Sequence, residues 1–69
     1  MEKIKITTEF IKLDQLLKLA SLAGSGSDAK HFITEGMVKV NGEVEIRRGK
    51  KIRVGDIIEF EGNKIEVIA

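Results

Sequence analysis

Residues 25–42 decide the fold of this chain, and they read Ser-Gly-Ser-Asp-Ala-Lys-His-Phe-Ile-Thr-Glu-Gly-Met-Val-Lys-Val-Asn-Gly. Ser25 and Asp28 have the spacing of a capping box, which predicts the start of a helix. Three apolar residues then recur at i, i+3 and i+4 and form one stripe: Ala29, Phe32 and Ile33. Gly36 follows this stripe, where a residue without a Cβ closes a helix in the left-handed conformation. The stretch therefore predicts a short helix that stops at Gly36.

The same stretch ends in a strand and a tight turn. Residues 38–40 alternate Val-Lys-Val, and the Asn-Gly pair at 41–42 is the strongest short turn signal in the chain. Two hairpin registers fit this pattern. A two-residue loop places Val40 opposite Glu43, and a three-residue loop places Val40 opposite Val44. We expect the three-residue loop, with a bulge at the turn, because it pairs apolar residues with each other.

Strand and helix patterns precede this stretch. Residues 3–7 alternate polar and apolar side chains, which predicts a first strand whose lysines are typical of a sheet edge. Residues 10–22 switch to a helical period, with apolar residues at i, i+3, i+4 and i+7. A short Gly/Ser run at 24–27 separates this helix from the next one. We therefore expect the two helices to form a helix-turn-helix-like corner.

Strands and turns fill the rest of the chain. Residues 57–61 and 64–68 predict a last hairpin around Gly62-Asn63, with Phe60 opposite Ile65. The order of strand, helix, helix and several strands predicts an α+β fold. We expect residues 1–69 to form a single domain, in which two short helices pack on a small antiparallel sheet of about four to five strands.

Composition excludes several classes of protein. The chain has no cysteine and a single histidine, His31, so we expect neither a disulfide nor a metal site. No apolar run is long enough for a membrane helix and the start has no signal-peptide core, so we expect a cytoplasmic protein without a membrane partner. The glycines form no phosphate-binding loop, and nothing in the sequence suggests a nucleophile paired with His31. We therefore expect no enzyme activity, no cofactor and no small-molecule substrate.

The clearest functional signal is the basic segment, residues 47–53, in a chain whose net charge is only +1. Its five cations, with no acid among them, are Arg47, Arg48, Lys50, Lys51 and Arg53. Such clusters attract phosphate backbones, and arginine adds a forked donor that suits phosphate geometry. A solvated, aggregation-resistant hairpin explains the same charges, so both interpretations stay open. Lys12 and Lys30 lie at or near the starts of the two helices, and they would extend one positive face if the helical corner packs beside the segment.

Phe10 and Phe32 are the aromatic candidates for stacking on bases. Both fall on apolar stripes, so we expect them to pack in the core instead. The chain has no tyrosine or tryptophan, which argues against a base-stacking sheet. It favours recognition of the shape and backbone of a folded RNA.

The chain resembles the alpha-L RNA-binding domain, which was first recognised in bacterial small-subunit ribosomal protein four and is also found in pseudouridine synthases and tyrosyl-tRNA synthetases. The resemblance covers about residues 11–58 and is carried by four segments: 12–17, 25–30, 33–42 and 54–58. Its most specific part is Glu-Gly-Met-Val-Lys-Val-Asn-Gly at 35–42. The whole chain is similar to the small stand-alone bacterial members of this family.

The resemblance implies binding of structured RNA, commonly ribosomal RNA or tRNA, through the helical corner and the adjacent loop. Lys12 and Lys30 match positions that are often basic in the family, whereas Gly26 stands where an arginine often follows the serine. Lys39 and the basic segment add further charge. The RNA-binding residues that we expect are Lys12, Lys30, Lys39, Arg47, Arg48, Lys50, Lys51 and Arg53. An alternative function is a protein-interaction adaptor that docks on a ribosome-associated or replication protein, suggested by the near-neutral charge and an open sheet edge.

Overall fold

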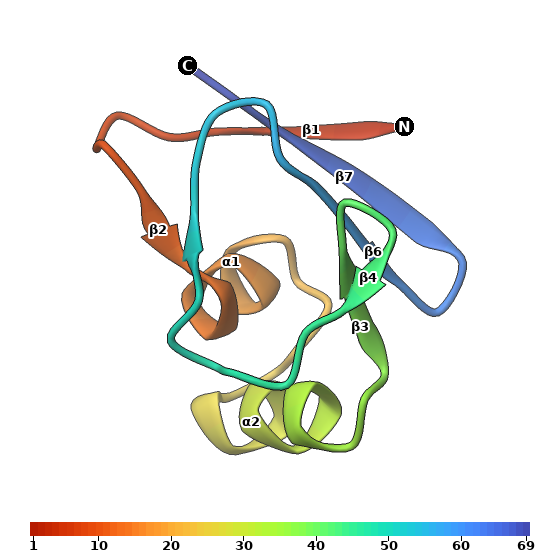
Figure 1. Cartoon of the computed structure of the whole chain (residues 1–69). Helices are drawn as coiled ribbons and strands as arrows, with labels where there is room; N and C mark the ends of the chain where they lie inside the picture. Colours follow the sequence, from red (N-terminus) through yellow and green to blue (C-terminus); the bar gives the residue numbers. More distant parts are fainter.

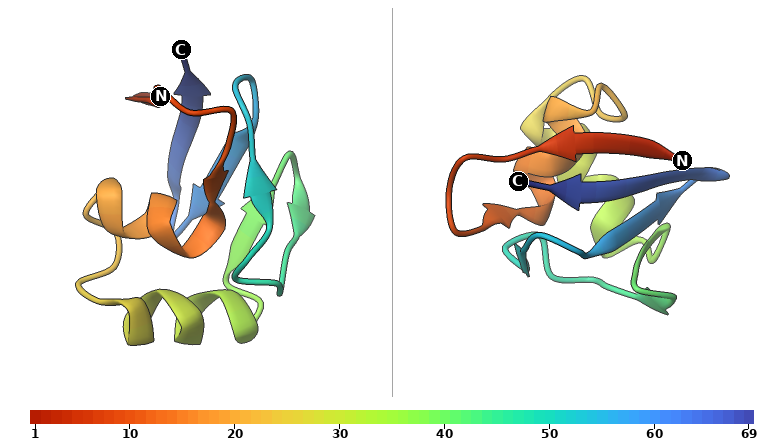
Figure 2. Two further views of the ribbon diagram at one scale, coloured as in Figure 1. Left: turned by 90° about the vertical axis from the view of Figure 1, so that its left-hand side faces the viewer. Right: turned by 90° about the horizontal axis from the view of Figure 1, so that it is seen from above.

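Two helices and seven strands make up the structure, a computed structural model that describes residues 1–69 (Figure 1). In chain order they are β1 (Glu2–Lys5), β2 (Ile11–Lys12), α1 (Leu13–Leu19), α2 (Gly26–Thr34), β3 (Val38–Val40), β4 (Glu43–Val44), β5 (Lys51–Ile52), β6 (Ile57–Phe60) and β7 (Asn63–Ile68). Five strands form one sheet in the order β1-β7-β6-β3-β4, and β2 pairs with β5 in a separate ribbon. Figure 2 shows the two helices together at one end of the molecule. Neither helix is long or apolar enough to span a lipid bilayer.

The α+β class and the two-helix corner are confirmed, but the five-stranded sheet is mixed rather than antiparallel. Strand β1 runs parallel to β7, with Ile4 beside Val67, while the other pairs are antiparallel. The two strands lie at opposite ends of the sequence, so no tight turn dictates their relative direction. The predicted edge position of the first strand is confirmed, and Ile6 just beyond β1 is buried.

Helix α2 forms where its local signals place it. The Asp28 N–H donates to Ser25 Oγ at 3.2 Å, so Ser25 caps the helix. The helix ends before Gly36, whose φ of +76° is the left-handed closing conformation. Ala29 and Ile33 are fully buried, and half-buried Phe32 lies against Phe60 with 4.7 Å between ring centroids. This stripe packs on the sheet as its spacing predicts.

Helix α1 is shorter than the helix that the pattern at 10–22 predicts. It covers Leu13–Leu19, and three of its leucines are fully buried: Leu13, Leu16 and Leu17. The preceding residues Ile11 and Lys12 are extended because they pair with β5. A tertiary partner thus overrides the local helical period at the start of this segment.

The expected register is wrong in each of the two hairpins, and the first hairpin has the alternative, two-residue loop. Strand β3 places Val40 opposite Glu43, so the loop has two residues, and Asn41 and Gly42 have φ values of +52° and +86°. Positive φ at both central residues is the tight turn that an Asn-Gly pair favours. The apolar pattern did not select the register because β4 is an exposed edge strand, in which Val44 is 54% accessible.

In the last hairpin Phe60 lies opposite Asn63, and the turn residues are Glu61 and Gly62. The register differs from the predicted one by two residues. A shift of two residues keeps the same side chains facing the core. Ile58 therefore still packs inward, opposite Ile65, with both side chains fully buried.

Candidate nucleic-acid interface

The ribbon of β2 and β5 brings a helix-flanking lysine to the basic segment. Ile11 pairs with Ile52, and Lys12 pairs directly with Lys51. Ile52 is fully buried, and because side chains alternate along a strand, Lys12 and Lys51 share the solvent face. Two like charges directly opposite each other repel. A bound anion between them would relieve this repulsion.

Helix α1 holds the backbone of the basic segment. The Leu13 N–H donates to the Lys50 carbonyl at 2.9 Å, and the Asp14 N–H donates to the Arg48 carbonyl at 3.1 Å. These bonds satisfy the first amides of a helix whose start has no side-chain cap. These bonds anchor the backbone of the segment, while the side chains of Arg48 and Lys51 are exposed to solvent.

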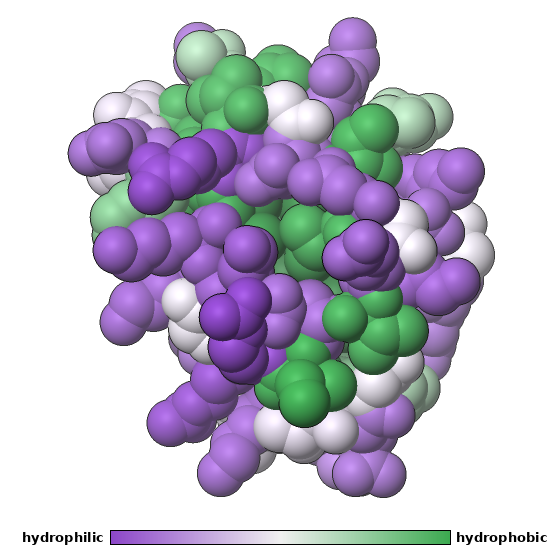
Figure 3. All heavy atoms as spheres, viewed as in Figure 1, coloured by the Kyte–Doolittle hydropathy of each residue, from purple (hydrophilic) through white to green (hydrophobic).

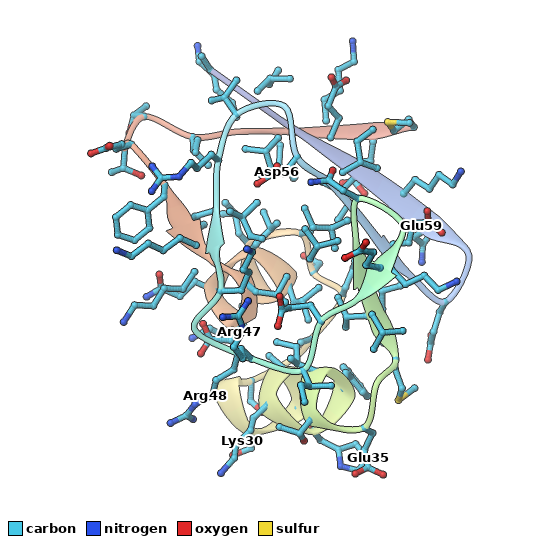
Figure 4. All side chains as sticks on the ribbon, in the orientation of Figure 1. Lys30, Glu35, Arg47, Arg48, Asp56 and Glu59 are labelled. Carbon is cyan, nitrogen blue, oxygen red and sulfur yellow. The ribbon has the colours of Figure 1, made fainter.

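Two hollows border the basic segment. The hairpin hollow, about 540 Å³, lies between the segment and the β3–β4 hairpin, and three acids line it: Glu43, Glu45 and Asp56. In Figure 4, Asp56 and Arg47 lie at opposite ends of the space between β5 and β4. The basic hollow, also about 540 Å³, is lined by the segment alone: Arg47, Gly49, Lys50, Lys51 and Arg53. Without an acid in its lining, the basic hollow suits a phosphate group better than the hairpin hollow does.

Glu45 engages one of the predicted RNA-binding residues. The Glu45 carboxylate accepts bonds from Arg47 Nε at 3.0 Å and Nη2 at 3.2 Å, and from the Arg47 backbone N–H at 3.0 Å. The bonds from the Arg47 side chain, followed by the one from its backbone, lower the pKa of Glu45 from 4.5 to about 2. The same pairing raises the pKa of Arg47. The charge of Arg47 is thus partly neutralised within the chain, unlike that of Lys51.

This ion pair predicts a loss of stability in acid. The pKa of Glu45 is lower in the folded chain than in the unfolded one, so its contribution is complete above about pH 4.5 and disappears as the pH falls toward about 2. Urea unfolding at pH 5 and pH 3 should show a smaller acid-induced loss of stability in Glu45→Gln than in the wild type. An equal loss in both proteins would show that other carboxylates account for the acid sensitivity.

Two motif residues, Asn41 and Asp56, tie the turns of the interface together. The Asp56 carboxylate accepts from Asn41 Nδ2 at 3.0 Å and from the Arg53 backbone N–H at 2.8 Å. Asn41 Oδ1 accepts from the Ile57 N–H at 2.9 Å. These bonds connect the β3–β4 hairpin to the end of the basic segment. Their role is positional, and the turn signal at 41–42 did not reveal that the side chains of Asn41 and Asp56 meet.

The other two predicted contacts lie apart from the ribbon. Lys30 is exposed on α2, and Figure 4 shows it projecting at the same end of the molecule as Arg48. Lys39 lies on the outer face of the five-stranded sheet, directly opposite Glu59 on β6. The structure therefore gathers Lys12 with the basic segment and leaves Lys39 beside an acid.

Phe10 was predicted to pack in the core, and this is wrong. It is half-buried but lies outside the core cluster, with Lys51 Nζ 4.9 Å and Arg53 Cζ 5.8 Å from its ring centroid. The spacing in the sequence could have indicated this position, since Phe10 and Lys12 are two residues apart, as are Lys51 and Arg53. Residues two apart share one face of an extended ribbon.

Comparison with known proteins identifies the family. A family model described as S4 domain matches residues 4–68. The chain is 52% identical over 59 residues to the probable ribosome maturation protein RlbA of Bacillus subtilis (strain 168), covering 86% of this chain and 83% of that protein. It is 44% identical over 59 residues to the putative RNA-binding protein YbcJ of Escherichia coli (strain K12), covering 86% and 84%.

The solution structure of E. coli YbcJ, described as revealing an alfaL motif involved in RNA-binding, superposes with a TM-score of 0.77. The match has 38% sequence identity and covers all of this chain and 89% of YbcJ. Fold, family model and sequence similarity agree with the resemblance seen in the motifs. The chain belongs to the S4 domain family, whose alpha-L motif is an RNA-binding module.

Proposed function

We propose that this chain binds structured RNA, either ribosomal RNA or tRNA, without catalysing a reaction. The observation that carries the proposal is the pairing of Lys12 with Lys51 on the solvent face of the β2–β5 ribbon, beside the basic segment. Phosphate groups are spaced along an RNA backbone, so a row of cations on an anchored loop matches them. No cofactor, metal or small-molecule substrate takes part in this function.

The proposed contacts differ in strength. Lys12, Lys50, Lys51 and Arg48 have no acidic partner within salt-bridge distance, and Lys30 extends the surface along α2. Arg53 forms a single 3.4 Å contact with exposed Glu9, which is a weak surface pair. Two residues contribute least to binding, because an acid of the chain lies beside each: Arg47 and Lys39.

The name of one relative supports ribosomal RNA as the partner. The name of RlbA refers to ribosome maturation, and this chain shares half of its aligned residues with that protein. We place the function in ribosome maturation or translation, in the cytoplasm. The domain would bind through phosphate contacts, which carry no sequence information. It would therefore recognise the RNA by its shape.

Salt titration tests the proposal. About five to seven phosphate contacts predict a slope of about −4 to −6 for log K against log salt, and Lys51→Ala should make this slope shallower by about one unit. The matched control is Lys64→Ala, an exposed lysine on β7 opposite Glu59. If the affinity and the salt slope of Lys51→Ala equal those of the wild type, Lys51 does not contact the RNA.

The edge strand β4 favours a second candidate function, the protein-interaction adaptor. Val44 and Ile46 are 54% and 60% accessible, and Figure 3 shows hydrophobic side chains exposed on the face that carries β4. An open edge with exposed apolar side chains can pair with another chain. If the chain is an adaptor, a protein partner should still co-purify with it after nuclease treatment. The partner should no longer co-purify with the Val44→Lys variant.

A further inference from the structure

Four side chains share the solvent face of the β2–β5 ribbon. The register pairs Ile11 with Ile52 and Lys12 with Lys51. Continuing it by one residue sets Phe10 opposite Arg53, which agrees with the 5.8 Å from Arg53 Cζ to the ring centroid. The face therefore carries one aromatic ring and three cations: Phe10, Lys12, Lys51 and Arg53.

Phe10 is the aromatic residue of the chain that the core does not take up. Phe60 is 3% accessible and belongs to the core cluster, and Phe32 packs against this cluster. Phe10 neither belongs to the cluster nor packs against it. Thr8 Oγ1 donates to the Phe10 carbonyl at 2.8 Å, which shapes the loop that leads into β2. A partly exposed aromatic ring beside two cations has the composition of single-strand binding surfaces, where rings stack on bases and cations track the backbone.

We propose that the Phe10 ring stacks on one unpaired nucleobase of the bound RNA, while Lys12 and Lys51 contact the adjoining phosphates. This inference rests on the proposed RNA-binding function and names the RNA feature that it selects. A continuous duplex hides the faces of its bases, so the partner is an RNA duplex interrupted by a bulge or a loop. Stacking on an aromatic side chain strengthens binding about 5- to 150-fold for each base.

The competing role for Phe10 is to hold Lys51 and Arg53 in place through cation–π contacts. That role would affect every RNA in the same way, because phosphate contacts do not distinguish a bulge from a duplex. A comparison of two RNAs therefore separates base stacking from the positioning of cations.

The experiment compares a blunt RNA duplex with the same duplex carrying one unpaired adenosine. The wild type should bind the bulged RNA about 5- to 150-fold more tightly. Phe10→Leu should keep the affinity for the blunt duplex and lose the preference. In Phe10→Trp the new side chain is the only tryptophan of the chain, so its fluorescence should be quenched by the bulged RNA and not by the blunt one.

Three results overturn the inference without affecting the proposed function. A wild type without preference for the bulge, or a Phe10→Leu variant that loses affinity for both RNAs equally, rules out stacking while leaving RNA binding intact. The same holds if the Phe10→Trp fluorescence responds equally to both RNAs. Failure of the wild type to bind either duplex would overturn the proposed function together with the inference.

Discussion

Replacing Lys12, Lys51 and Arg53 together by glutamine is expected to lower RNA affinity about 100- to 1,000-fold at about 0.1 M salt. Each cation that contacts a phosphate releases about 0.9 counterion, which contributes about eightfold to binding at this salt concentration relative to 1 M. The three side chains lie on one face of the β2–β5 ribbon, so they are expected to contact one continuous stretch of backbone. The salt slope should become shallower by about three units.

The control for this variant removes the same charge from another surface. Lys3, Lys5 and Lys64 are exposed on β1 and β7, and their replacement by glutamine changes the net charge by the same amount. We expect the control to lose less than about fivefold in affinity, because distant charges are screened beyond about 10 Å at this salt. Equal losses in the two variants would show that net charge, rather than the ribbon, governs binding. Isothermal titration with a single RNA measures both.

Asp56→Ala is expected to lower the free energy of unfolding by about 2 to 3 kcal/mol. The substitution removes the acceptor for the Arg53 N–H and for Asn41 Nδ2, and it releases the Asn41 side chain that holds the Ile57 N–H. For a domain of this size the melting temperature should fall by roughly 10 to 20 °C. Because the bonds connect the β3–β4 hairpin to the basic segment, RNA affinity should decrease in the fraction that stays folded.

Glu2→Ala is the matched control, since it removes an exposed carboxylate of β1 that makes no hydrogen bond. Its free energy of unfolding should stay within about 0.5 kcal/mol of the wild type. Urea denaturation followed by circular dichroism measures both variants. If Asp56→Ala were as stable as Glu2→Ala, the Asn41–Asp56 contact would not support the fold.

Local sequence signals determined the helix α2 and the turn at Asn41-Gly42. Ser25 caps α2 through a bond to Asp28 three residues away, and Gly36 closes it with positive φ. These features depend on neighbours in the chain, so a single sequence is enough to predict them. The motifs at 35–42 and 54–58 were equally local, and they led to the correct family.

Pairing between distant segments was decided only in the tertiary structure. The registers of both hairpins, the parallel direction of β1 and the extended conformation of Lys12 all depend on which strand lies alongside. Apolar alternation restricts a register to steps of two residues and leaves the exposed edge β4 undetermined. Tertiary contacts can also override a local helical period, as they do before α1.

The candidate interface divides in the same way. The sequence by itself showed that residues 47–53 are basic, because charge is a property of composition. Only the structure showed that Lys12 lies opposite Lys51, that Glu45 forms an ion pair with Arg47, and that Phe10 lies outside the core. The Lys12–Lys51 contact and the position of Phe10 depend on the pairing of β2 with β5, which buries Ile52 in the core.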